Sequence, residues 1–477
     1  MKKIYFIEPK APNLHIFSIF PLPRLGNLIL GTLMKERGWQ AEVVFEETMK
    51  IDFAALKEAE LVGISTITST APRAYAIADK VRGMGVPVIM GGPHVTYLPG
   101  EALEHADFVI RGEGERPLMA FIDAWEKDHD YSAVPNLSYS RNGVIVHNQM
   151  GAFEENLDQI PMPDFSLFSK ALQRRLGGRR IIPVLTSRGC PYNCSFCSVT
   201  GLFGRRYRFR STENVIAELR RYDSRKNVIF FYDDNFAADR NHTKDLLKAM
   251  IRERFKFKWS TQVRADFTQD PELVRLMKKA GCITLYIGLE SVNPDSLKDM
   301  KKKQTVEGIS RALKVLRKER IHVHGMFVYG FDHDDWKTVK KTVKFAKKAG
   351  LTSSQFLILT PLPGSEFFSQ VIGEKRIKFT DWSLYDAHHA VFQPARISLP
   401  GLQRAQIFSH KKFYSRLAQL KSLLKGKWTA LGVALYARNL NKVWKKKNKT
   451  FLKALDLLRP KKDAVVSIDY REMISLD

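Results

Sequence analysis

Cysteine is scarce in this 477-residue chain, which contains only four. Three of them, Cys190, Cys194 and Cys197, lie within eight residues of one another. So few cysteines, three of them clustered, suit a metal site in a reducing compartment better than a disulfide framework. We therefore expect a cytoplasmic protein.

Long apolar runs are also missing. The best candidates, residues 61–72 and 428–437, are much shorter than the roughly 18 residues needed to cross a bilayer. The basic start resembles a secretory signal, but Glu8 and Lys10 interrupt the apolar run that follows it. We expect no transmembrane span and interpret residues 4–8 as a first strand.

Acidic residues are absent between Asp386 and Asp456, a stretch that holds fifteen Lys and Arg residues. The whole chain has 77 Lys and Arg against 50 Asp and Glu, a formal net charge of +27. This balance favours an anionic partner, whether nucleic acid, a membrane surface or a phosphorylated substrate.

Apolar residues recur at helical spacing in this basic stretch, namely Phe413, Leu417, Leu420 and Leu424, which predicts at least one amphipathic basic helix. One interpretation is peripheral adsorption to anionic lipid, with Trp428 and Trp444 as interfacial anchors. The other is a solvated helical face whose leucines pack on the rest of the protein. RNA binding is the least favoured interpretation.

Strands alternate with helices in the N-terminal part of the chain. The short β-like runs are 4–8, 41–45, 61–66, 86–90 and 108–111, and the amphipathic stretches are 25–37, 51–59, 75–83, 101–105 and 115–125. This alternation predicts an α/β fold with a doubly wound, Rossmann-like parallel sheet. Ligands of such sheets bind at the carboxyl ends of the strands.

Small residues follow three of these strands. The candidate binding residues there are Ser65, Thr66, Gly91, Gly92, Gly112, Glu113 and Gly114. Loops of this kind leave room for a bulky flat ligand, although the glycines could equally serve only to turn the chain.

A second series of strands follows a connecting segment that contains a hairpin at residues 141–143. Its strands are expected at 181–187, 227–232, 258–263, 283–289, 322–329 and 354–360. Helical stretches separate them, which predicts a six-stranded partial (β/α) barrel. We therefore divide the chain into an N-terminal domain (1–135), a linker (136–180), a barrel (181–380) and a basic helical region (381–477).

The three clustered cysteines come directly after the first barrel strand. Three thiolates on one loop can each hold one iron of a cubane cluster, which leaves the fourth iron open to a substrate. Zinc is the competitor, but a closed zinc site requires four ligands and no histidine is near. Zinc or uncoordinated thiols stay open as alternatives, and Cys282 is expected to be a small core residue.

The Cys-x3-Cys-x2-Cys spacing, with Phe196 before the last cysteine, resembles that of the radical S-adenosylmethionine (SAM) superfamily. The resemblance implies an oxygen-sensitive enzyme with a [4Fe–4S] cluster and SAM. It also implies that Phe196 belongs to the cofactor-binding residues, together with residues at the strand ends that contact SAM, namely Asp233, Asp234, Gln262, Arg264 and Glu290. Each of these could instead belong to a surface turn or a salt bridge.

A doubly wound domain placed before such a cysteine loop resembles the cobalamin-binding branch of that superfamily, which includes hopanoid methylases and the anaerobic magnesium-protoporphyrin ester oxidative cyclase. The matching sequence motifs are Gly91-Gly92-Pro93-His94, Gly112-Glu113-Gly114-Glu115, Pro163-Asp164 and Thr360-Pro-Leu-Pro-Gly364. The resemblance implies that the N-terminal loops bind cobalamin.

One motif of many cobalamin proteins is absent: the sequence has no Asp-x-His-x-x-Gly, which supplies a histidine to cobalt. We expect cobalamin to bind without a protein histidine and His94 to be a loop or corrin-edge residue. A degenerate domain that binds no cobalamin stays open.

The resemblance implies a cobalamin-dependent C-methyltransferase that acts on a hydrophobic small molecule and receives electrons from a donor such as flavodoxin or ferredoxin. The alternatives are an oxidative cyclase or another non-methylating radical enzyme and, outside enzymes, a cluster- or cobalamin-binding redox sensor. Tyr385, His388 and His389 are candidates for the substrate pocket. No individual side chain is assigned a catalytic role.

Overall fold

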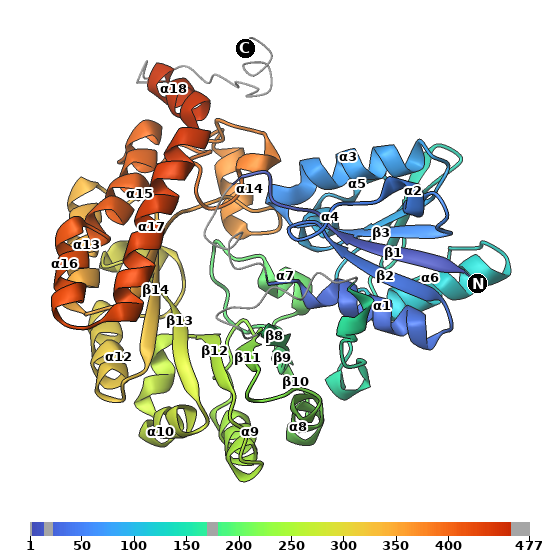
Figure 1. The fold of residues 1–477 in the computed structure, drawn as a ribbon. Coiled ribbons are helices and arrows are strands. Elements are labelled where there is room, and N and C mark those ends of the chain that lie inside the picture. Colours follow the sequence, from blue (N-terminus) through green and yellow to red (C-terminus); the bar gives the residue numbers. More distant parts are fainter. Residues whose placement is uncertain (1, 14–21, 169–179, 459–477) are drawn as a thin grey trace. The chain divides into compact units, whose positions relative to one another are not determined.

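The computed structural model describes residues 2–13, 22–168 and 180–458 (Figure 1). These residues form two compact units. The first comprises residues 2–13, 22–168, 180–191 and 198–228, and the second comprises residues 192–197 and 229–458. The predicted limits of the four segments stay a prediction.

The first sheet has the strand order β2-β1-β3-β4-β5-β6-β7. Its strands are β1 (Lys3–Glu8), β2 (Gln40–Phe45), β3 (Leu61–Ser65), β4 (Val88–Gly91), β5 (Phe108–Ile110), β6 (Leu137–Arg141) and β7 (Val144–His147). The first five are parallel, and the expected hairpin supplies the antiparallel strands β6 and β7. The order reverses at β1, so the topological switch point lies between β1 and β3.

Helices cover both faces of this sheet, which confirms the doubly wound prediction. Helices α1 (Leu25–Glu36) and α6 (Glu115–Lys127) lie on one face, and α2 (Phe53–Leu56), α3 (Ala71–Arg82) and α5 (Pro99–Leu103) lie on the other (Figure 1). A short helix, α4 (Pro93–Tyr97), follows β4. Helix α6 shows the sequence logic, because Leu118, Phe121 and Ile122 recur at helical spacing and are fully buried.

The second sheet has the order β15-β14-β13-β12-β11-β8 and confirms the predicted six-stranded partial barrel. Its strands are β8 (Arg180–Val184), β11 (Asn227–Phe231), β12 (Lys258–Val263), β13 (Cys282–Glu290), β14 (His322–Tyr329) and β15 (Ser353–Ile358). The ladders from β12 to β15 are parallel. Two short strands, β9 (Ser187–Arg188) and β10 (Arg208–Phe209), form a separate antiparallel pair.

Helices alternate with these strands: α7 (Val199–Phe203), α8 (Thr212–Arg220), α9 (Arg240–Arg252), α10 (Pro271–Lys279), α11 (Pro294–Asp299), α12 (Val306–Lys318), α13 (Trp336–Lys348) and α14 (Glu366–Gly373). Their starts are set by local chemistry. The side chains of Asp239, Asp270, Thr305 and Asp335 each accept hydrogen bonds from first-turn N–H groups of α9, α10, α12 and α13.

The C-terminal region is helical, as expected, with α15 (Leu399–Phe413), α16 (Arg416–Leu424), α17 (Trp428–Lys447) and α18 (Lys449–Leu457). The predicted amphipathic basic helix is present as α16, which carries Leu417, Leu420 and Leu424, but Phe413 is not part of it. Extended backbone at Ser415 ends one helix and begins the next, so Phe413 belongs to α15 and is buried. None of the described residues of α16 is buried, and its leucines therefore do not pack on the barrel.

The two tryptophans expected at a membrane interface differ in environment. Trp428 is 69% exposed at the start of α17, whereas Trp444 is 3% exposed and its ring lies 5.0 Å from that of His389. The prediction for Trp444 is wrong, because its side of α17 faces the interior. No helix within the described residues is long and apolar enough to cross a membrane.

Candidate cofactor site

The cysteine loop begins just after β9. Cys190, Cys194 and Cys197 are each half-buried, and none of these described thiols is joined in a disulfide. The N–H of Cys197 donates to the carbonyl of Cys194 (3.1 Å), and the N–H of Cys190 donates to the carbonyl of Gly204 (3.2 Å). Among the described residues, no three His, Cys, Asp or Glu side chains are grouped closely enough to hold a metal ion.

The fourth cysteine belongs to the core. Cys282 is 1% exposed at the start of β13, and burial raises the pKa of its thiol. This environment suppresses the thiolate that a metal requires.

Within the second unit, residues 192–197 of the loop are held by the barrel helices. The N–H of Ser195 donates to the carbonyl of Met300 (3.3 Å), and its hydroxyl donates to the carbonyl of Asp299 (3.0 Å), both at the end of α11. The ring of Phe196 lies edge-on to that of Phe331, with centroids 6.1 Å apart. Phe196 therefore packs against residues that follow β14.

An acidic loop follows β11. Asp233 is fully buried, whereas the residue Asp234 is exposed to solvent. The protein atoms packed around the Asp234 carboxyl, together with the charge of Asp233, raise the pKa of Asp234 to about 6. The side chain of Asn235 accepts the N–H of Arg264 (3.1 Å), which joins this loop to the end of β12.

Arg264 lies against the cysteine loop within the same unit. Its guanidinium carbon is 3.8 Å from the centre of the Tyr192 ring, a cation–π contact. One guanidinium nitrogen donates to the carbonyl of Lys302 (2.8 Å). A cation at Arg264 and a carboxylate at Asp234 suit the two charged groups of an amino acid, and therefore the methionyl end of SAM.

Glu290 ends β13 in a strained conformation. Its φ is +59°, unusual for a residue with a side chain, and the register of β13 with β14 shifts there. Its carboxylate forms an ion pair with Lys302, and a side chain at Gly288 would overlap both groups. Lys302 was not predicted, because it lies between α11 and α12 rather than at a strand end.

Gln262 is half-buried on β12, in register with Tyr286 on β13, and its carbonyl accepts the N–H of Phe236 (3.0 Å). The side chain of Gln262 is therefore the neighbour, in the sheet, of the Tyr286 ring.

An additional carboxylate organises the end of β14. Asp334 is 1% exposed and accepts the N–H groups of Gly330 (3.1 Å) and Phe331 (3.2 Å) and the hydroxyl of Ser296 (2.7 Å). Burial raises the pKa of Asp334 to about 6 despite these hydrogen bonds. This residue shapes the loop beside Phe196 and was not predicted.

The loops after β4 and β5 are joined by one side chain in the first unit. The hydroxyl of Thr96 donates to the carbonyl of Gly92 (2.9 Å) and accepts the N–H of Gly112 (2.9 Å). Ser65, Gly91, Gly92, Gly112 and Gly114 are half-buried, so the edge presents small groups. Such an edge fits a broad flat ligand, as cobalamin requires.

Thr66 and Gly92 have internal roles. Thr66 is fully buried, and its hydroxyl bonds that of Thr70 (2.9 Å). Gly92 has φ +103°, and an added Cβ would lie 2.5 Å from the carbonyl oxygen of Thr66. Packing within the protein therefore explains this glycine without reference to a ligand.

His94 lies inside the first unit and is 0% exposed. Its Nε2 is 3.3 Å from a carboxylate oxygen of Glu101, and its ring lies 6.1 Å from that of Tyr75. The expectation of a loop or corrin-edge residue is wrong, because the first turn of α4 carries the side chain into the interior.

Glu113 joins a buried group of charges within the first unit. Its carboxylate forms ion pairs with Arg188 (3.3 Å) and Arg208 (2.6 Å), and Glu115 pairs with Arg188 (2.6 Å). Burial by itself raises the pKa of Glu115, but the ion pair with Arg188 and the charge of Arg208 lower it more, so it lies below its usual value.

The predicted substrate residues are internal. Tyr385 and His388 are buried, and Nδ1 of His389 lies 2.9 Å from a carboxylate oxygen of Asp386. Burial raises the pKa of Asp386, but His389 and His388 together lower it to about 2. Because Nε2 of His389 also bonds Asn448 (2.8 Å), this cluster anchors the start of α18.

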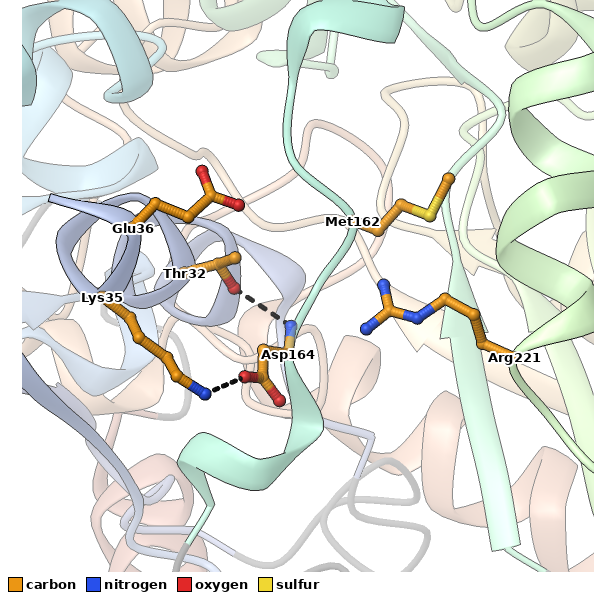
Figure 2. A pocket seen from close by; sticks show the side chains of 6 residues that line it. All are labelled: Thr32, Lys35, Glu36, Met162, Asp164 and Arg221. Carbon is orange, nitrogen blue, oxygen red and sulfur yellow. Dashed lines mark hydrogen bonds and ion pairs between the residues drawn. The ribbon is translucent and has the colours of Figure 1, made fainter. Parts of the chain in front are cut away.

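A hollow of about 520 Å³ lies beside α1 and the segment before β8 (Figure 2). It is lined by Thr32, Lys35, Glu36, Met162, Asp164 and Arg221. The N–H of Asp164 donates to Thr32 (3.0 Å), and its carboxylate pairs with Lys35 (2.7 Å). None of the predicted site residues lines this hollow. The contacts of Asp164 instead attach the segment that contains the Pro163-Asp164 motif to α1.

Two family models match the chain. The model of the B12 binding domain matches residues 20–122, and that of the radical SAM superfamily matches residues 184–346. The matches fall on the first sheet and on the barrel, and they confirm the predicted cofactor set of cobalamin, SAM and a [4Fe–4S] cluster.

Curated relatives span most of the chain. An uncharacterized methyltransferase of Pyrococcus horikoshii is 30% identical over 83% of this chain and 88% of its own length. The bacteriochlorophyllide d C-12(1)-methyltransferase of Chlorobaculum tepidum is 28% identical over 88% and 89%. The anaerobic magnesium-protoporphyrin IX monomethyl ester cyclase of Rubrivivax gelatinosus is 26% identical over 80% and 72%.

A solved structure shows the same fold. The cobalamin-dependent SAM radical enzyme OxsB, with aqua-cobalamin and SAM bound, matches with a TM-score of 0.69 at 16% identity, covering 100% of this chain and 78% of its own.

Proposed function

Because this chain belongs to the cobalamin-binding branch of the radical SAM enzymes, we propose that it transfers a methyl group to a carbon atom of a hydrophobic small molecule. The observation that carries the proposal is the order of the domains, a doubly wound B12-type domain followed by a Cys-x3-Cys-x2-Cys loop at the start of a barrel. Two methyltransferases are similar to this chain over most of both chains.

The roles of the residues follow from their chemistry. Cys190, Cys194 and Cys197 hold the cluster, whose assembly brings the three thiolates together, since metal binding and the ordering of its ligands are coupled. Asp234 receives the amino group of SAM, and Arg264 receives its carboxylate. When bound, the cluster and SAM supply a carbon-centred radical and cobalamin supplies the methyl group, while the protein orients the reactants and excludes solvent.

The second candidate is oxidative ring formation without methyl transfer, which the similarity to the anaerobic cyclase favours. Both candidates are enzymes, and the relatives with assigned activities are enzymes too, which disfavours a sensor. The products distinguish the two candidates, because only methylation consumes a methyl group from SAM.

The test is SAM turnover by the anaerobically reconstituted full-length protein, with and without hydroxocobalamin. We expect 5′-deoxyadenosine in both cases, S-adenosylhomocysteine only with cobalamin, and a corrin absorbance band on the protein. Cys194→Ala should abolish both products, whereas the control Cys282→Ala, a change in the core, should retain the cluster. Absence of 5′-deoxyadenosine from the reconstituted protein would contradict the proposal.

We also propose that a low-potential flavodoxin or ferredoxin supplies the electron, because the cluster must be reduced before SAM is cleaved. Turnover with a reduced flavodoxin in place of a chemical reductant tests this partner.

We further propose peripheral contact of a cytoplasmic enzyme with an anionic lipid bilayer through α16 and the start of α17. Leu417, Leu420, Leu423, Leu424 and Trp428 are exposed there by 71%, 50%, 46%, 76% and 69%. Soluble proteins rarely expose so contiguous an apolar group without a partner.

The charge beside this apolar group is of one sign. Arg416, Lys421, Lys425 and Lys427 are exposed in the same segment, which contains no acidic residue. Basic residues next to an exposed apolar face are typical of helices that lie in the interface of anionic membranes, each charge adding about 1 kcal/mol near the surface. Such contact would bring the enzyme to a substrate dissolved in the bilayer.

Flotation with vesicles tests this contact. The full-length protein should float with vesicles of phosphatidylcholine and phosphatidylglycerol, less so at high salt, and not with phosphatidylcholine alone. The triple change Leu417→Ser, Leu424→Ser and Trp428→Ser should abolish flotation, whereas Ile372→Ser, an exposed apolar residue on α14, should not. Equal flotation of the triple variant would contradict the proposal.

A further inference from the structure

The first compact unit contains a buried group of charges immediately before the first cysteine. Arg188, two residues before Cys190, pairs with Glu113 (3.3 Å) and Glu115 (2.6 Å). Arg208, opposite Arg188 in the β9–β10 pair, makes two hydrogen bonds to Glu113 (2.6 and 2.9 Å). The four charged side chains are only 3–13% exposed.

Burial restricts the motion of these four charged side chains. A buried charge is tolerated only when it is paired and hydrogen-bonded, because its desolvation must be compensated. Arg208 also donates to the carbonyls of Glu154 (2.7 Å) and Phe203 (2.9 Å), so its position is fixed from several sides. The loop of residues 112–115 and the segment of residues 187–190 therefore cannot move independently.

A second tie lies immediately after the last cysteine, within the same unit. The hydroxyl of Tyr97, at the end of α4, donates to the carbonyl of Ser198, the residue that follows Cys197 (2.7 Å). A Cβ at Gly201 would overlap this hydroxyl, so α7 packs directly on Tyr97.

The ion pairs of Glu113 and the hydrogen bond of Tyr97 both come from the same part of the first sheet. Thr96, the neighbour of Tyr97, joins the loop after β4 to the loop after β5 through Gly92 and Gly112. These loops form the edge of the first sheet at which parallel α/β domains bind their ligands. A change at this edge is therefore transmitted to the chain on both sides of the cysteines.

We propose that Glu113 and Tyr97 are positioning residues that couple the ligand edge of the first sheet to the two ends of the cysteine loop. The inference rests on the proposed function for the identity of the ligand, cobalamin. Coupling between two binding sites is reciprocal. Bound cobalamin therefore restricts the segment that carries Cys190, and a loaded cysteine loop strengthens cobalamin binding.

The experiment measures alkylation of Cys190 by iodoacetamide in the iron-free full-length protein, with and without saturating hydroxocobalamin, using mass spectrometry. Corrin absorbance verifies that cobalamin is bound. We expect cobalamin to slow the alkylation of Cys190 by about fivefold or more in the unmodified chain. Buried Cys282 should stay unreacted and so reports that the protein is folded.

Glu113→Gln keeps the size of the side chain but removes the charge between the two arginines. We expect cobalamin to leave its Cys190 alkylation rate unchanged. The matched control is Glu155→Gln, because Glu155 pairs with Arg206 in the same region but on the surface, with side chains 58% and 73% exposed. This control should respond to cobalamin as the unmodified chain does.

Tyr97→Phe removes one hydroxyl. This variant tests the coupling if Glu113→Gln does not fold or does not bind cobalamin. It should weaken the response to cobalamin by about threefold, on the scale of one buried hydrogen bond. The coupling is disproved if cobalamin is bound but does not slow alkylation of the unmodified chain, or if the folded variants respond fully. Absence of any corrin band would instead refute the proposed function, and the coupling with it.

Discussion

At the scale of single residues, close packing decides which glycines of the ligand edge can change. Gly92→Ala would place a Cβ 2.5 Å from the carbonyl oxygen of Thr66 at φ +103°. Left-handed strain and overpacking together predict a loss of about 2–4 kcal/mol in unfolding free energy. Gly143→Ala, at φ +79° with no atom within 4 Å, should lose only about 1–2 kcal/mol.

Urea denaturation of both variants, followed by circular dichroism, measures the difference. Equal losses would show that the backbone conformation alone, and not contact with Thr66, requires glycine at residue 92.

Protonation of one carboxylate should also govern SAM binding at this scale. The pKa of Asp234 is raised to about 6, so the group is ionised at neutral pH and becomes neutral as the pH falls. A cationic amino group requires the ionised form, and the apparent affinity for SAM should therefore fall about tenfold between about pH 7 and pH 5.

Equilibrium dialysis of SAM with the reconstituted protein measures this profile. In Asp234→Asn the affinity should be weaker at neutral pH and nearly independent of pH over this range. A variant that keeps the pH profile of the unmodified chain would assign the titration to another group.

At the scale of elements, α16 differs from the helices around it. Its leucines are exposed, whereas Phe451 of α18 is 0% exposed. Leu424→Ser should change the unfolding free energy by less than about 0.5 kcal/mol. Phe451→Ala should lower it by about 3–5 kcal/mol, since it removes a buried ring and leaves a cavity.

Guanidinium denaturation of the two variants in the absence of lipid tests this contrast. A large loss in Leu424→Ser would mean that α16 is covered by the protein itself and does not present a lipid-binding face.

At the scale of the whole molecule, cobalamin should stabilise the first sheet because it binds only the folded edge. At a concentration a hundredfold above its dissociation constant, hydroxocobalamin should add about 2.7 kcal/mol to the free energy of the unfolding that exposes the backbone amides of this sheet. Hydrogen exchange of β3, β4 and β5 measures the effect, and Cys194→Ala should preserve it, since this change leaves the N-terminal loops intact. Bound cobalamin without slower exchange would contradict this prediction.

Much of the architecture was predicted from local pattern. Strands β12 and β14 occupy the predicted residues 258–263 and 322–329, because each is a short β-rich run bounded by turns. The cysteine spacing indicated the cofactor chemistry for a similar reason, since its three thiols lie within eight residues. Local spacing needs no knowledge of the rest of the fold.

Residues whose roles depend on distant contacts were not predictable. Lys302, which lies between α11 and α12, forms an ion pair with Glu290 at the end of β13. Asp334 accepts a backbone hydrogen bond from Gly330 after β14, and the ring of Trp444 packs against that of His389. The apolar spacing from Phe413 to Leu424 predicted a helix, but spacing cannot show the break at Ser415 or which helical face finds a partner.

The sequence by itself determined the α/β architecture, the family and the cofactors, because periodicity and ligand spacing are local properties of the chain. Only the tertiary structure decided what the candidate residues do. It placed Glu113, predicted to contact a ligand, between Arg188 and Arg208, which follow it by 75 and 95 residues. Buried charges require partners, and folding alone determines which distant residues supply them.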